Sequence, residues 1–380
     1  MKTAAVSHEQ DALDARFMAR AIELAARGTW RVSPNPRVGA VIARQAESLA
    51  EGWHKEHGGP HAEAEALRDA RARGLDVRGA TLYVTLEPCG AFEGKLTPPC
   101  VEAVLGSGVA RIVVAQRDPN PNVDGRSLDR LEKAGIEVRI GVLEDEARAL
   151  NGPFNKWNSE RVPYVTAKWA MSLDGKIASR LGRSKWISGE ASRRRAHALR
   201  GEVDAVLVGV NTVIQDDPLL TRRDAEGRDP ARVVVDSALR LSLESQLVKT
   251  ARESAVLVVT TDHASEEGVK ALRERGVGVV MVGAEASRVD PVALLDALGR
   301  RGYQHVLVEG GGELLGSFFA HDLVDRVVCF VAPKILGGDR APGPARGEGV
   351  ADVAEALKLV RLRAEPCGED LVLEGLVHVW

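Results

Sequence analysis

The feature that most constrains the fold is a regular alternation of strand-like and helix-like segments. In the first part of the chain, short apolar runs alternate with stretches whose apolar residues recur at helical spacing. The strand-like runs are residues 38–43, 81–86, 111–115 and 137–140, and the helix-like stretches are 13–25, 61–73, 101–105 and 128–134. Alternation of this kind predicts an α/β domain built on a mostly parallel sheet.

A segment rich in asparagine, glycine and proline, residues 151–163, interrupts this rhythm and is predicted to be a linker. We therefore expect one domain over residues 1–150 and another over 164–380, which agrees with a length of 380 residues. The second domain shows the same kind of pattern, with expected strands at 164–170, 205–208, 232–235, 255–260, 278–282, 305–309 and 326–331. Residues 371–379 are expected to close its sheet as an antiparallel edge strand.

The composition excludes several classes of protein. A net charge of −3 supplies no overall basic field for nucleic acid, and the arginines at 193–195 are interpreted as a solvated helix face. No apolar run approaches the ~18 residues of a membrane span, and residues 1–17 lack the apolar core of a signal peptide. Four cysteines are too few for a disulfide framework. We expect a cytoplasmic protein with neither a nucleic-acid nor a membrane partner.

Three short motifs of the first domain predict a catalytic zinc site. They are HAE at 61–63, EPC at 87–89 and TPPC at 97–100. One imidazole, from His61, and two thiolates, from Cys89 and Cys100, leave a fourth tetrahedral position open for water. This ligand set, with Glu63 as a general acid/base that is not a ligand, is the signature of zinc deaminases. The alternative is a surface His-x-Glu beside two structural cysteines. Cys329 and Cys367 have no such motifs near them; Cys329 is assigned to the core, and Cys367 is given no role.

The local sequence places these groups at helix ends. Residues two apart do not share a helix face, so His61 and Glu63 can converge on one metal only near a helix terminus, and the glycines and proline at 58–60 favour this. The prolines at 98–99 likewise set Cys100 at the start of a helix, where the dipole favours a thiolate.

Further motifs in the same order give a specific resemblance. SPNPRVGAV at 33–41, TLEPC at 85–89 and DPNP at 118–121, together with the zinc motifs, resemble the bifunctional riboflavin-biosynthesis deaminase/reductases. The resemblance implies a cytidine-deaminase-like N-terminal domain that removes an amino group from a diaminopyrimidinone ribosylamino phosphate. It also implies that Asn35 and His54 help to hold the pyrimidine. Without it, a plain turn former between prolines is the favoured interpretation of Asn35.

A glycine turn in the second domain is a candidate phosphate cradle. The strand ending at Glu309 runs into three glycines at 310–312, after which apolar residues recur at helical spacing. Such a turn presents free N–H groups and the helix dipole to an anion. A tight strand-to-helix turn with no ligand gives a similar pattern, and the dinucleotide fingerprint of spaced glycines is absent.

The neighbouring motifs extend the resemblance over residues 17–373. They are KWAMSLDGKIA at 168–178, SKWI at 184–187, VGVNT at 208–212, DDPLLT at 216–221 and APKILGG at 332–338. They resemble the reductase half of the same family, whose fold is similar to dihydrofolate reductase and whose cofactor is NADPH. By this resemblance, the residues facing NADPH are Ala170, Trp186, Thr212, Asp216, Ser237, Gly311, Gly312, Glu313, Leu314, Leu315, Gly316 and Ser317, and those facing the ribosyl phosphate are Ser184, Leu220, Arg223 and Glu309.

The assigned chemistry is reasonable for these side chains. Arg223 can grip a phosphate bidentately, Glu309 can accept bonds from sugar hydroxyls, and Asp216 can assist proton transfer as hydride reaches the sugar. The alternative for Asp216 is an acidic turn before a proline. Between Cys89 and Cys100 this chain has ten residues where the family has eight, without the family's histidine; Lys95 is then the expected cation for the substrate's phosphate.

We therefore expect a two-domain enzyme that uses Zn²⁺ and NADPH on a small pyrimidine ribosyl phosphate, and we expect a homo-oligomer. Two alternatives remain at this point. One is a divergent paralogue that acts on a related pyrimidine or pterin. The other is a nucleic-acid-editing deaminase with a binding module, against which the weak charge argues.

Overall fold

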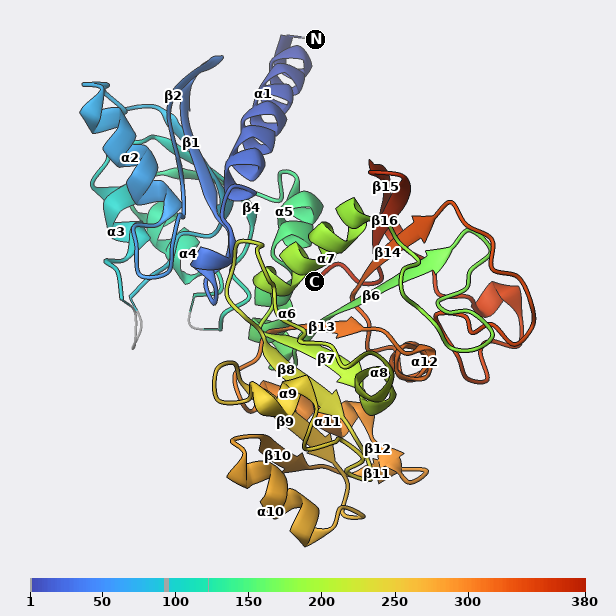
Figure 1. Cartoon of the computed structure of the whole chain (residues 1–380). Coiled ribbons are helices and arrows are strands. Elements are labelled where there is room, and N and C mark those ends of the chain that lie inside the picture. Colours follow the sequence, from blue (N-terminus) through green and yellow to red (C-terminus); the bar gives the residue numbers. More distant parts are fainter. Residues whose placement is uncertain (1, 92–95, 122) are drawn as a thin grey trace. The chain divides into compact units, whose positions relative to one another are not determined.

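The computed structural model describes residues 2–91, 96–121 and 123–380, and it divides into two compact units (Figure 1). The N-terminal unit extends to Glu160 and includes Val379 and Trp380, and the C-terminal unit is Arg161–His378. Both have the alternating strand and helix order that the sequence predicts. Across the described residues no helix combines the length and the apolar character needed to cross a membrane.

The described part of the N-terminal unit is a five-stranded sheet between two layers of helices. Its elements are α1 (Lys2–Ala25), a 3-10 turn (Trp30–Val32), β1 (Gly39–Arg44), β2 (Glu47–Trp53), α2 (Ala62–Ala72), β3 (Thr81–Leu86), α3 (Cys100–Leu105), β4 (Arg111–Gln116), α4 (Arg126–Lys133), β5 (Glu137–Ile140), α5 (Glu144–Leu150) and α6 (Gly152–Glu160). The strand order is β2-β1-β3-β4-β5, in which β3, β4 and β5 are parallel and β1 is antiparallel to both neighbours.

Alternate residues of each strand enter two separate hydrophobic clusters, because side chains alternate across a sheet. Ile42, Val84 and Ile112 pack with α2, α3 and α4, whereas Val41 and Val113 pack with α1 and α5. Figure 1 shows α1 and α2 on opposite sides of the β1–β2 hairpin. The sheet is therefore covered on both faces, as a mostly parallel sheet requires.

The expected linker at 151–163 differs in the structure, because residues 152–160 form helix α6 within the N-terminal unit. Pro153 lies in the first turn, where a missing N–H costs no helical hydrogen bond. Asn155 is buried, donates to the carbonyl oxygen of Trp380 and exchanges side-chain hydrogen bonds with Gln116. These tertiary contacts outweigh the low helix propensity of asparagine and glycine, which made the segment read as a linker.

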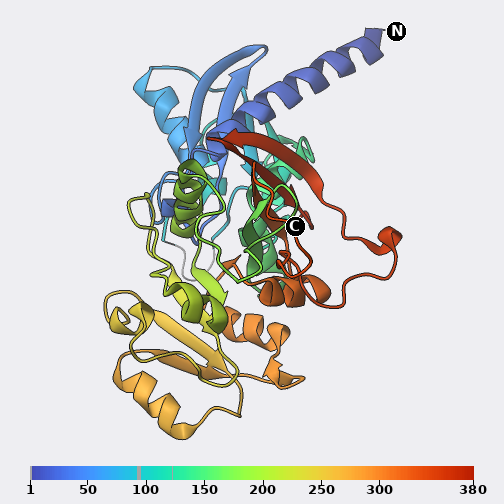
Figure 2. The ribbon, with the colours of Figure 1, turned by 45° about the vertical axis from the view of Figure 1, so that its right-hand side comes forward.

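Residues 161–378, all of which are described, form the C-terminal unit around a nine-stranded sheet. The elements are β6 (Tyr164–Ser172), α7 (Glu190–Glu202), β7 (Ala205–Gly209), α8 (Val210–Asp216), β8 (Ala231–Val235), α9 (Gln246–Lys249), β9 (Val256–Thr260), α10 (Glu266–Glu274), β10 (Gly278–Met281), β11 (Ala284–Glu285), β12 (Arg288–Val289), α11 (Pro291–Gly299), β13 (His305–Glu309), α12 (Gly312–Ala320), β14 (Arg326–Ala332), a 3-10 turn (Val353–Glu355), β15 (Val360–Cys367) and β16 (Asp370–Leu376). Figure 2 shows the chain between β14 and β15 as a long excursion that carries this 3-10 turn.

The sheet order is β10-β9-β8-β7-β13-β6-β14-β16-β15, parallel from β10 to β14. The segment 371–379 is antiparallel to its neighbour, as expected, but the prediction that it forms the edge of the sheet is wrong. β16 is antiparallel to β14, but β15 pairs with its other side and is the edge strand. The sequence analysis did not predict β15, although Val360, Leu362 and Ala364 alternate there with charged residues, as in a strand with one apolar face.

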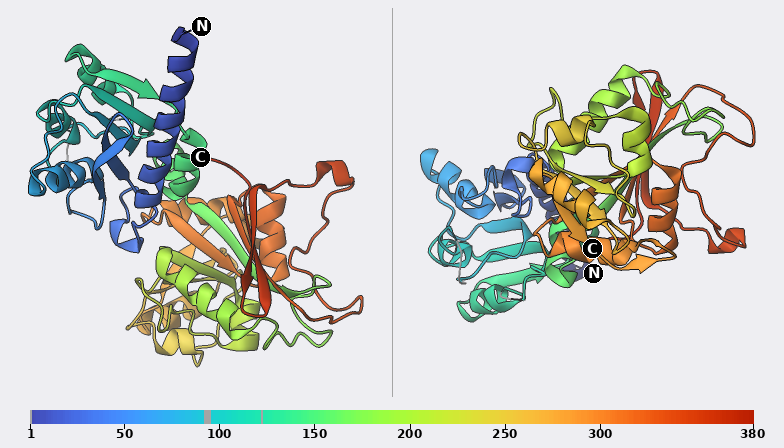
Figure 3. Two further views of the ribbon diagram at one scale, coloured as in Figure 1. Left: turned by 90° about the horizontal axis from the view of Figure 1, so that it is seen from above. Right: turned by 60° about the horizontal axis from the view of Figure 1, so that its bottom comes forward.

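Two hydrophobic clusters again fill the two faces of this sheet. Helices α7 to α10 pack against one face, and α11 and α12 against the other. The left view of Figure 3 shows the orange helices and the yellow-green α7 on opposite sides of the strands. This three-layer arrangement leaves the carboxyl ends of the central parallel strands as the edge where a ligand site can form.

Candidate functional site

The three expected zinc ligands converge in the N-terminal unit. His61 is the N-cap of α2, Cys89 follows β3, and Cys100 is the first residue of α3. Among the described residues, their ligand atoms form one group, within 4.8 Å of one another. Nδ1 of His61 lies 3.4 Å from the sulfur of Cys89 and 3.3 Å from that of Cys100.

These distances fit a tetrahedral metal. Ordinary Zn–N and Zn–S bond lengths at the tetrahedral angle separate nitrogen and sulfur by about 3.6 Å. Nε2 of His61 points elsewhere and lies 3.2 Å from the hydroxyl oxygen of Thr97. A second hydrogen-bonding partner of this kind fixes the ring orientation of a metal-ligating histidine. The donor set therefore fits zinc, bound through Nδ1.

Glu63 lies beside this ligand group in the first turn of α2, where its side chain is buried. Burial is the main cause that raises the pKa of its carboxyl, and the negative charge of a Cys89 thiolate adds to the effect. A carboxyl in such surroundings can both accept and return a proton, as a general acid/base must.

Asn35 and His54, the expected pyrimidine ligands, contact each other next to the zinc ligands. Asn35 Nδ2 lies 3.1 Å from His54 Nε2, and His54 Nδ1 lies 3.0 Å from the carbonyl oxygen of Pro60. An amide nitrogen only donates and a carbonyl only accepts, so the pair fits a neutral imidazole protonated on Nδ1. Burial lowers the pKa of His54, which agrees with the neutral form. The rings of His54 and His61 are 5.0 Å apart, and the amide oxygen of Asn35 remains able to accept from a ligand.

The segment that carries Cys89 is fixed by a carboxylate that the sequence reasoning did not assign. Glu87 is buried and accepts hydrogen bonds from the backbone N–H groups of Asp118, Gly125 and Ser127. Gly125 and Ser127 lie at the start of α4, where a carboxylate stabilises the free N–H groups. Glu87 thus ties the end of β3 to α4, two residues before Cys89. The sequence feature that could have identified Glu87 is its place between Leu86 and Pro88 in the motif TLEPC.

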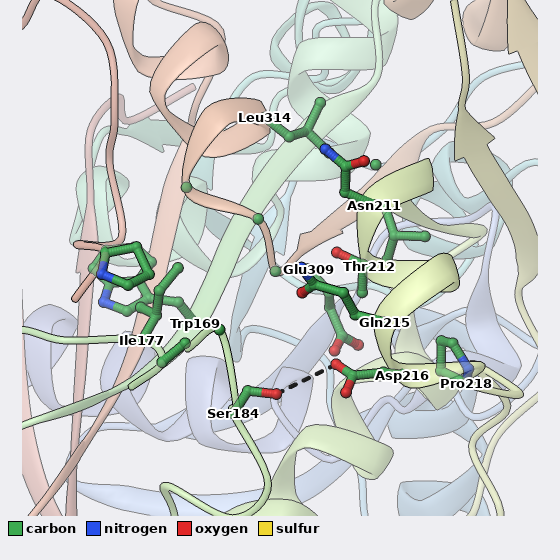
Figure 4. Close-up of a pocket in the computed structure, with 18 of the residues that line it drawn as sticks. Trp169, Ile177, Ser184, Asn211, Thr212, Gln215, Asp216, Pro218, Glu309 and Leu314 are labelled. Atoms are coloured by element: carbon green, nitrogen blue, oxygen red, sulfur yellow. Dashed lines mark hydrogen bonds between the residues drawn. The ribbon is translucent and has the colours of Figure 1, made fainter. Parts of the chain in front are cut away.

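The C-terminal unit contains a cavity of about 1560 Å³ at the carboxyl ends of β6, β7, β8 and β13 (Figure 4). Most of the residues expected to face NADPH or the sugar phosphate line it. They are Ala170, Ser184, Trp186, Thr212, Asp216, Ser237, Gly311, Gly312, Glu313, Leu314, Ser317, Leu220, Arg223 and Glu309. The structure thus brings together segments that the sequence separates by more than a hundred residues.

Two residues of the expected cofactor set do not line this cavity. Leu315 is buried in the core between α12 and the sheet. Gly316 faces the chain segment at Arg346, since a Cβ built on it would lie 1.6 Å from the Arg346 carbonyl oxygen. The structure therefore does not bring these two residues to the cavity, and contact of the range 311–317 with NADPH stays a prediction from the sequence. Leu220 lines the cavity, but its side chain belongs to the core, so its backbone is the part available to a ligand.

The glycine turn is a cradle that a side chain would fill. Gly310 and Gly311 have φ of +84° and +34°, which side chains disfavour. A Cβ on Gly310 would lie 3.4 Å from the Thr212 hydroxyl oxygen. The turn leads directly into α12, whose N-cap is Gly311. Close backbone approach at a helix N-terminus fits the diphosphate of a dinucleotide cofactor.

Glu309 is held by two cations inside the cavity. Arg200 donates from Nε to Oε1 at 2.6 Å and from Nη2 to Oε2 at 3.0 Å, and Lys168 Nζ lies 3.4 Å from Oε2. Burial alone raises the pKa of Glu309, but Arg200 and Lys168 outweigh it and lower the pKa to about 2. Arg200 also donates to the carbonyl oxygen of Thr221, and so fixes the segment that carries Leu220 and Arg223.

The sequence reasoning gave no role to Lys168 or Arg200. Lys168 stands in the quoted motif at 168–178, which was its available signal. Arg200 lies on a helix among other arginines, and its partner is 109 residues away, so no local pattern distinguishes it.

Asp216 closes the other side of the same space. Its Oδ2 accepts from the hydroxyl of Ser184 at 3.3 Å, and its Oδ1 lies 3.6 Å from Nζ of Lys185. Figure 4 shows Ser184 and Asp216 together, below Glu309. The carboxylate is partly exposed to the cavity and can exchange a proton with a bound ligand.

The cavity is basic although the whole chain is acidic. Among the described residues that line it are eleven lysine and arginine side chains against five carboxylates. A cleft lined by one sign of charge attracts ligands of the opposite sign. Both an NADPH molecule and a sugar phosphate are anions that this field favours.

One expected substrate residue, Lys95, lies outside the described residues, as do its three predecessors in the loop after Cys89. Its role as a phosphate ligand therefore stays a prediction from the sequence.

Two family models match the chain. The model described as the cytidine and deoxycytidylate deaminase zinc-binding region matches residues 11–116, and the one described as the RibD C-terminal domain matches residues 163–373. Each falls on one of the two units. The expected α/β fold class, with a deaminase-like N-terminal domain and a reductase-type C-terminal domain, is confirmed.

Curated relatives align over almost the whole length. The chain is 41% identical to the riboflavin biosynthesis protein RibD of Actinobacillus pleuropneumoniae, over 96% of this chain and 95% of that protein. It is 42% identical to RibD of Aquifex aeolicus, over 95% and 98%. Among solved structures, it is similar to a diaminohydroxyphosphoribosylaminopyrimidine deaminase/5-amino-6-(5-phosphoribosylamino)uracil reductase from Thermotoga maritima, with a TM-score of 0.80 and 36% identity over 97% of this chain and 99% of that one.

Proposed function

The chain belongs to the RibD family of riboflavin biosynthesis proteins, and from this premise we propose which residues perform each of its two reactions. It is a bifunctional enzyme with a zinc-dependent deaminase domain and an NADPH-dependent reductase domain. The substrate that we propose is a diaminopyrimidinone ribosylamino phosphate. The first reaction replaces its 2-amino group by oxygen, and the second reduces its ribosyl chain to ribityl.

In the deaminase, His61, Cys89 and Cys100 would hold the zinc ion, which supplies a water of lowered pKa and a Lewis-acid contact. Glu63 takes a proton from the attacking water and delivers it to the leaving amino group, which departs as ammonia. Its burial beside the three ligands supports this role. The amide oxygen of Asn35 is placed to accept from the pyrimidine, while His54 orients that amide.

In the reductase, the glycine turn at 310–312 and the first turn of α12 would hold the NADPH diphosphate, and NADPH supplies the hydride. Hydride addition forms a C–H bond at the first sugar carbon while the ring C–O bond breaks, so the ring oxygen must gain a proton. Asp216, with Ser184 bonded to it, is the group that we assign to this proton transfer. Glu309 remains a carboxylate between Arg200 and Lys168 and can accept from sugar hydroxyls.

The observation that carries the deaminase assignment is the approach of His61 Nδ1 to both sulfurs, at 3.3 and 3.4 Å, beside the buried Glu63. The test is incubation of the purified chain with the diaminopyrimidinone phosphate, with and without NADPH, followed by mass analysis. Exchange of an amino group for oxygen is expected without NADPH, and a gain of two further hydrogens with it. No change in either reaction would contradict the proposed substrate.

We also propose that the enzyme is a homo-oligomer formed through the β15 edge. Val360 and Leu362 on β15 and Leu371 on β16 are exposed apolar side chains, and an exposed apolar edge strand favours pairing with another chain. Light scattering after size exclusion should show an oligomer that Leu362→Glu dissociates, and a monomeric wild type would contradict this. We propose the cytoplasm as the compartment because none of the four cysteines, all of which the structure describes, forms a disulfide.

A further inference from the structure

Arg240 and Arg288 lie at one end of the reductase cavity and take no part in the two reactions described above. Arg240 follows β8, and its Nη2 donates to Oδ1 of Asn211 at 2.9 Å. Arg288 belongs to β12, and the next residue, Val289, donates its backbone N–H to the Ser237 hydroxyl oxygen at 3.0 Å. The two arginines therefore flank the turn that begins at Ser237.

Helix α8 runs from this end of the cavity to the end where the chemistry is proposed. Its last residue, Asp216, meets Ser184 where hydride transfer is proposed, whereas Asn211, near its start, meets Arg240. Figure 4 shows Asn211 with Leu314 at one end of the site and Ser184 with Asp216 at the other. Along the helix axis, the rise from Asn211 to Asp216 is about 7.5 Å.

A dinucleotide that reaches across this cavity has only one orientation that allows reaction. Its nicotinamide must lie at the Asp216 end, and its diphosphate fits the glycine turn at 310–312. Its adenosine then falls at the end bounded by Ser237, Arg240 and Arg288. NADPH carries its 2′-phosphate on the ribose of that adenosine, and NADH has a hydroxyl group there.

The donors at this end suit a phosphate dianion. Ser237 accepts from Val289 through its oxygen, so its hydroxyl hydrogen remains available to an acceptor. Arg288 is 71% exposed and touches one carboxylate oxygen of Glu313 at 3.4 Å, so most of its five donors can reach a ligand. Guanidinium groups bind phosphate oxygens with paired, charge-assisted hydrogen bonds.

We propose that Arg240 and Arg288 bind the 2′-phosphate of NADPH and thereby give the reductase its selectivity for NADPH over NADH. This rests on the proposed function in one respect, namely that the cavity holds the cofactor. The two cofactors differ only in this phosphate, so the arginines contribute to the binding of NADPH and not to that of NADH.

The test compares kcat/KM for NADPH and for NADH, measured in the linear range on the full-length enzyme with deaminated substrate. Arg288→Ala and Arg240→Ala should each lower kcat/KM for NADPH by about tenfold or more and change it for NADH by less than about twofold. Calorimetric titration with 2′,5′-ADP should weaken by the same factor. Arg288→Lys, which keeps the charge, should retain a larger share of the selectivity than Arg288→Ala.

Arg180→Ala is the matched control. Arg180 is also an exposed arginine of the cavity lining, on the segment after β6, and its loss should affect both cofactors equally. Unchanged melting temperatures will show that the variants fold. If Arg240 and Arg288 variants lose activity with NADPH and NADH in parallel, or lose none, the proposal is refuted while the cavity stands as the cofactor site. If the wild type fails to bind NADP⁺ in the calorimeter, the proposed function of the cavity is refuted as well.

Discussion

Replacing Arg200 by methionine should destabilise the C-terminal unit by about 3–5 kcal/mol, because the change leaves a buried carboxylate without its main partner. Arg200 reaches both oxygens of Glu309, at 2.6 and 3.0 Å, whereas Lys168 reaches one at 3.4 Å. The side chains of Arg200 and Glu309 are only 12% and 8% exposed, so water from the cavity can replace the guanidinium only in part. Methionine keeps most of the apolar stem, which confines the loss to charge and hydrogen bonds.

The same pair predicts a dependence on pH. The pKa of Glu309 falls from its ordinary value of 4.5 to about 2 in the folded chain. A carboxyl with a depressed folded-state pKa stabilises the fold above its unfolded pKa, and this stabilisation is lost as the pH falls from about 5 to about 2. The shift corresponds to on the order of 3 kcal/mol. In Arg200→Met burial dominates and the pKa rises, so the stability difference from wild type should be largest above pH ~5 and shrink in acid.

The assay is differential scanning calorimetry of the full-length chain, in which the transition of the reductase domain is the one that NADP⁺ moves to higher temperature. A double-mutant cycle with Glu309→Gln isolates the interaction, and the double variant should be more stable than the two single effects predict. Arg194→Met on the same helix is the matched control. Arg194 pairs with Glu190 at the surface, so its loss should cost less than about 0.5 kcal/mol.

A coupling energy below about 0.5 kcal/mol between Arg200 and Glu309 would refute this reasoning. The lowered pKa of Glu309 would be refuted by a different result. In that case the difference in unfolding free energy between Arg200→Met and wild type would stay constant from neutral pH down to pH ~3.

Four further outcomes follow from the two sites. Elemental analysis should find about one zinc per chain in the wild type and much less in Cys89→Ser, and equal contents would remove the site. Glu63→Gln should slow ammonia release by roughly two to four decades while NADPH oxidation with deaminated substrate continues, and joint loss would mean that the domains depend on each other. Asp216→Asn and Glu309→Gln should each reduce NADPH oxidation while ammonia release persists. If NADPH oxidation persists in both variants, the reductase site lies elsewhere. Lys95→Ala should raise the deaminase KM by roughly tenfold without changing zinc content, and a constant KM would favour an altered substrate.

The sequence by itself determined which elements exist where its local signals are strong. β3 and β13 have the boundaries that their apolar runs predict, because such runs, ended by glycine or proline, have few other ways to be buried. The zinc ligand set was also predictable, because two Pro-Cys motifs and a His-Ala-Glu motif in one α/β domain supply the ligands of a catalytic zinc site. The resemblance in motif order then supplied the reaction.

Tertiary structure decided what depends on partners distant in the chain. The buried side chain of Asn155 makes α6 of a segment that reads as a linker, and pairing with β16 makes a strand of the exposed β15. Only the fold decides that Nδ1 of His61, and not Nε2, faces the sulfurs, because Thr97 lies beside the other nitrogen. The Arg200–Glu309 pair is decided in the same way. Local sequence carries propensity and periodicity, whereas the energy of a buried ion pair or a shared ligand arises only when separate elements meet.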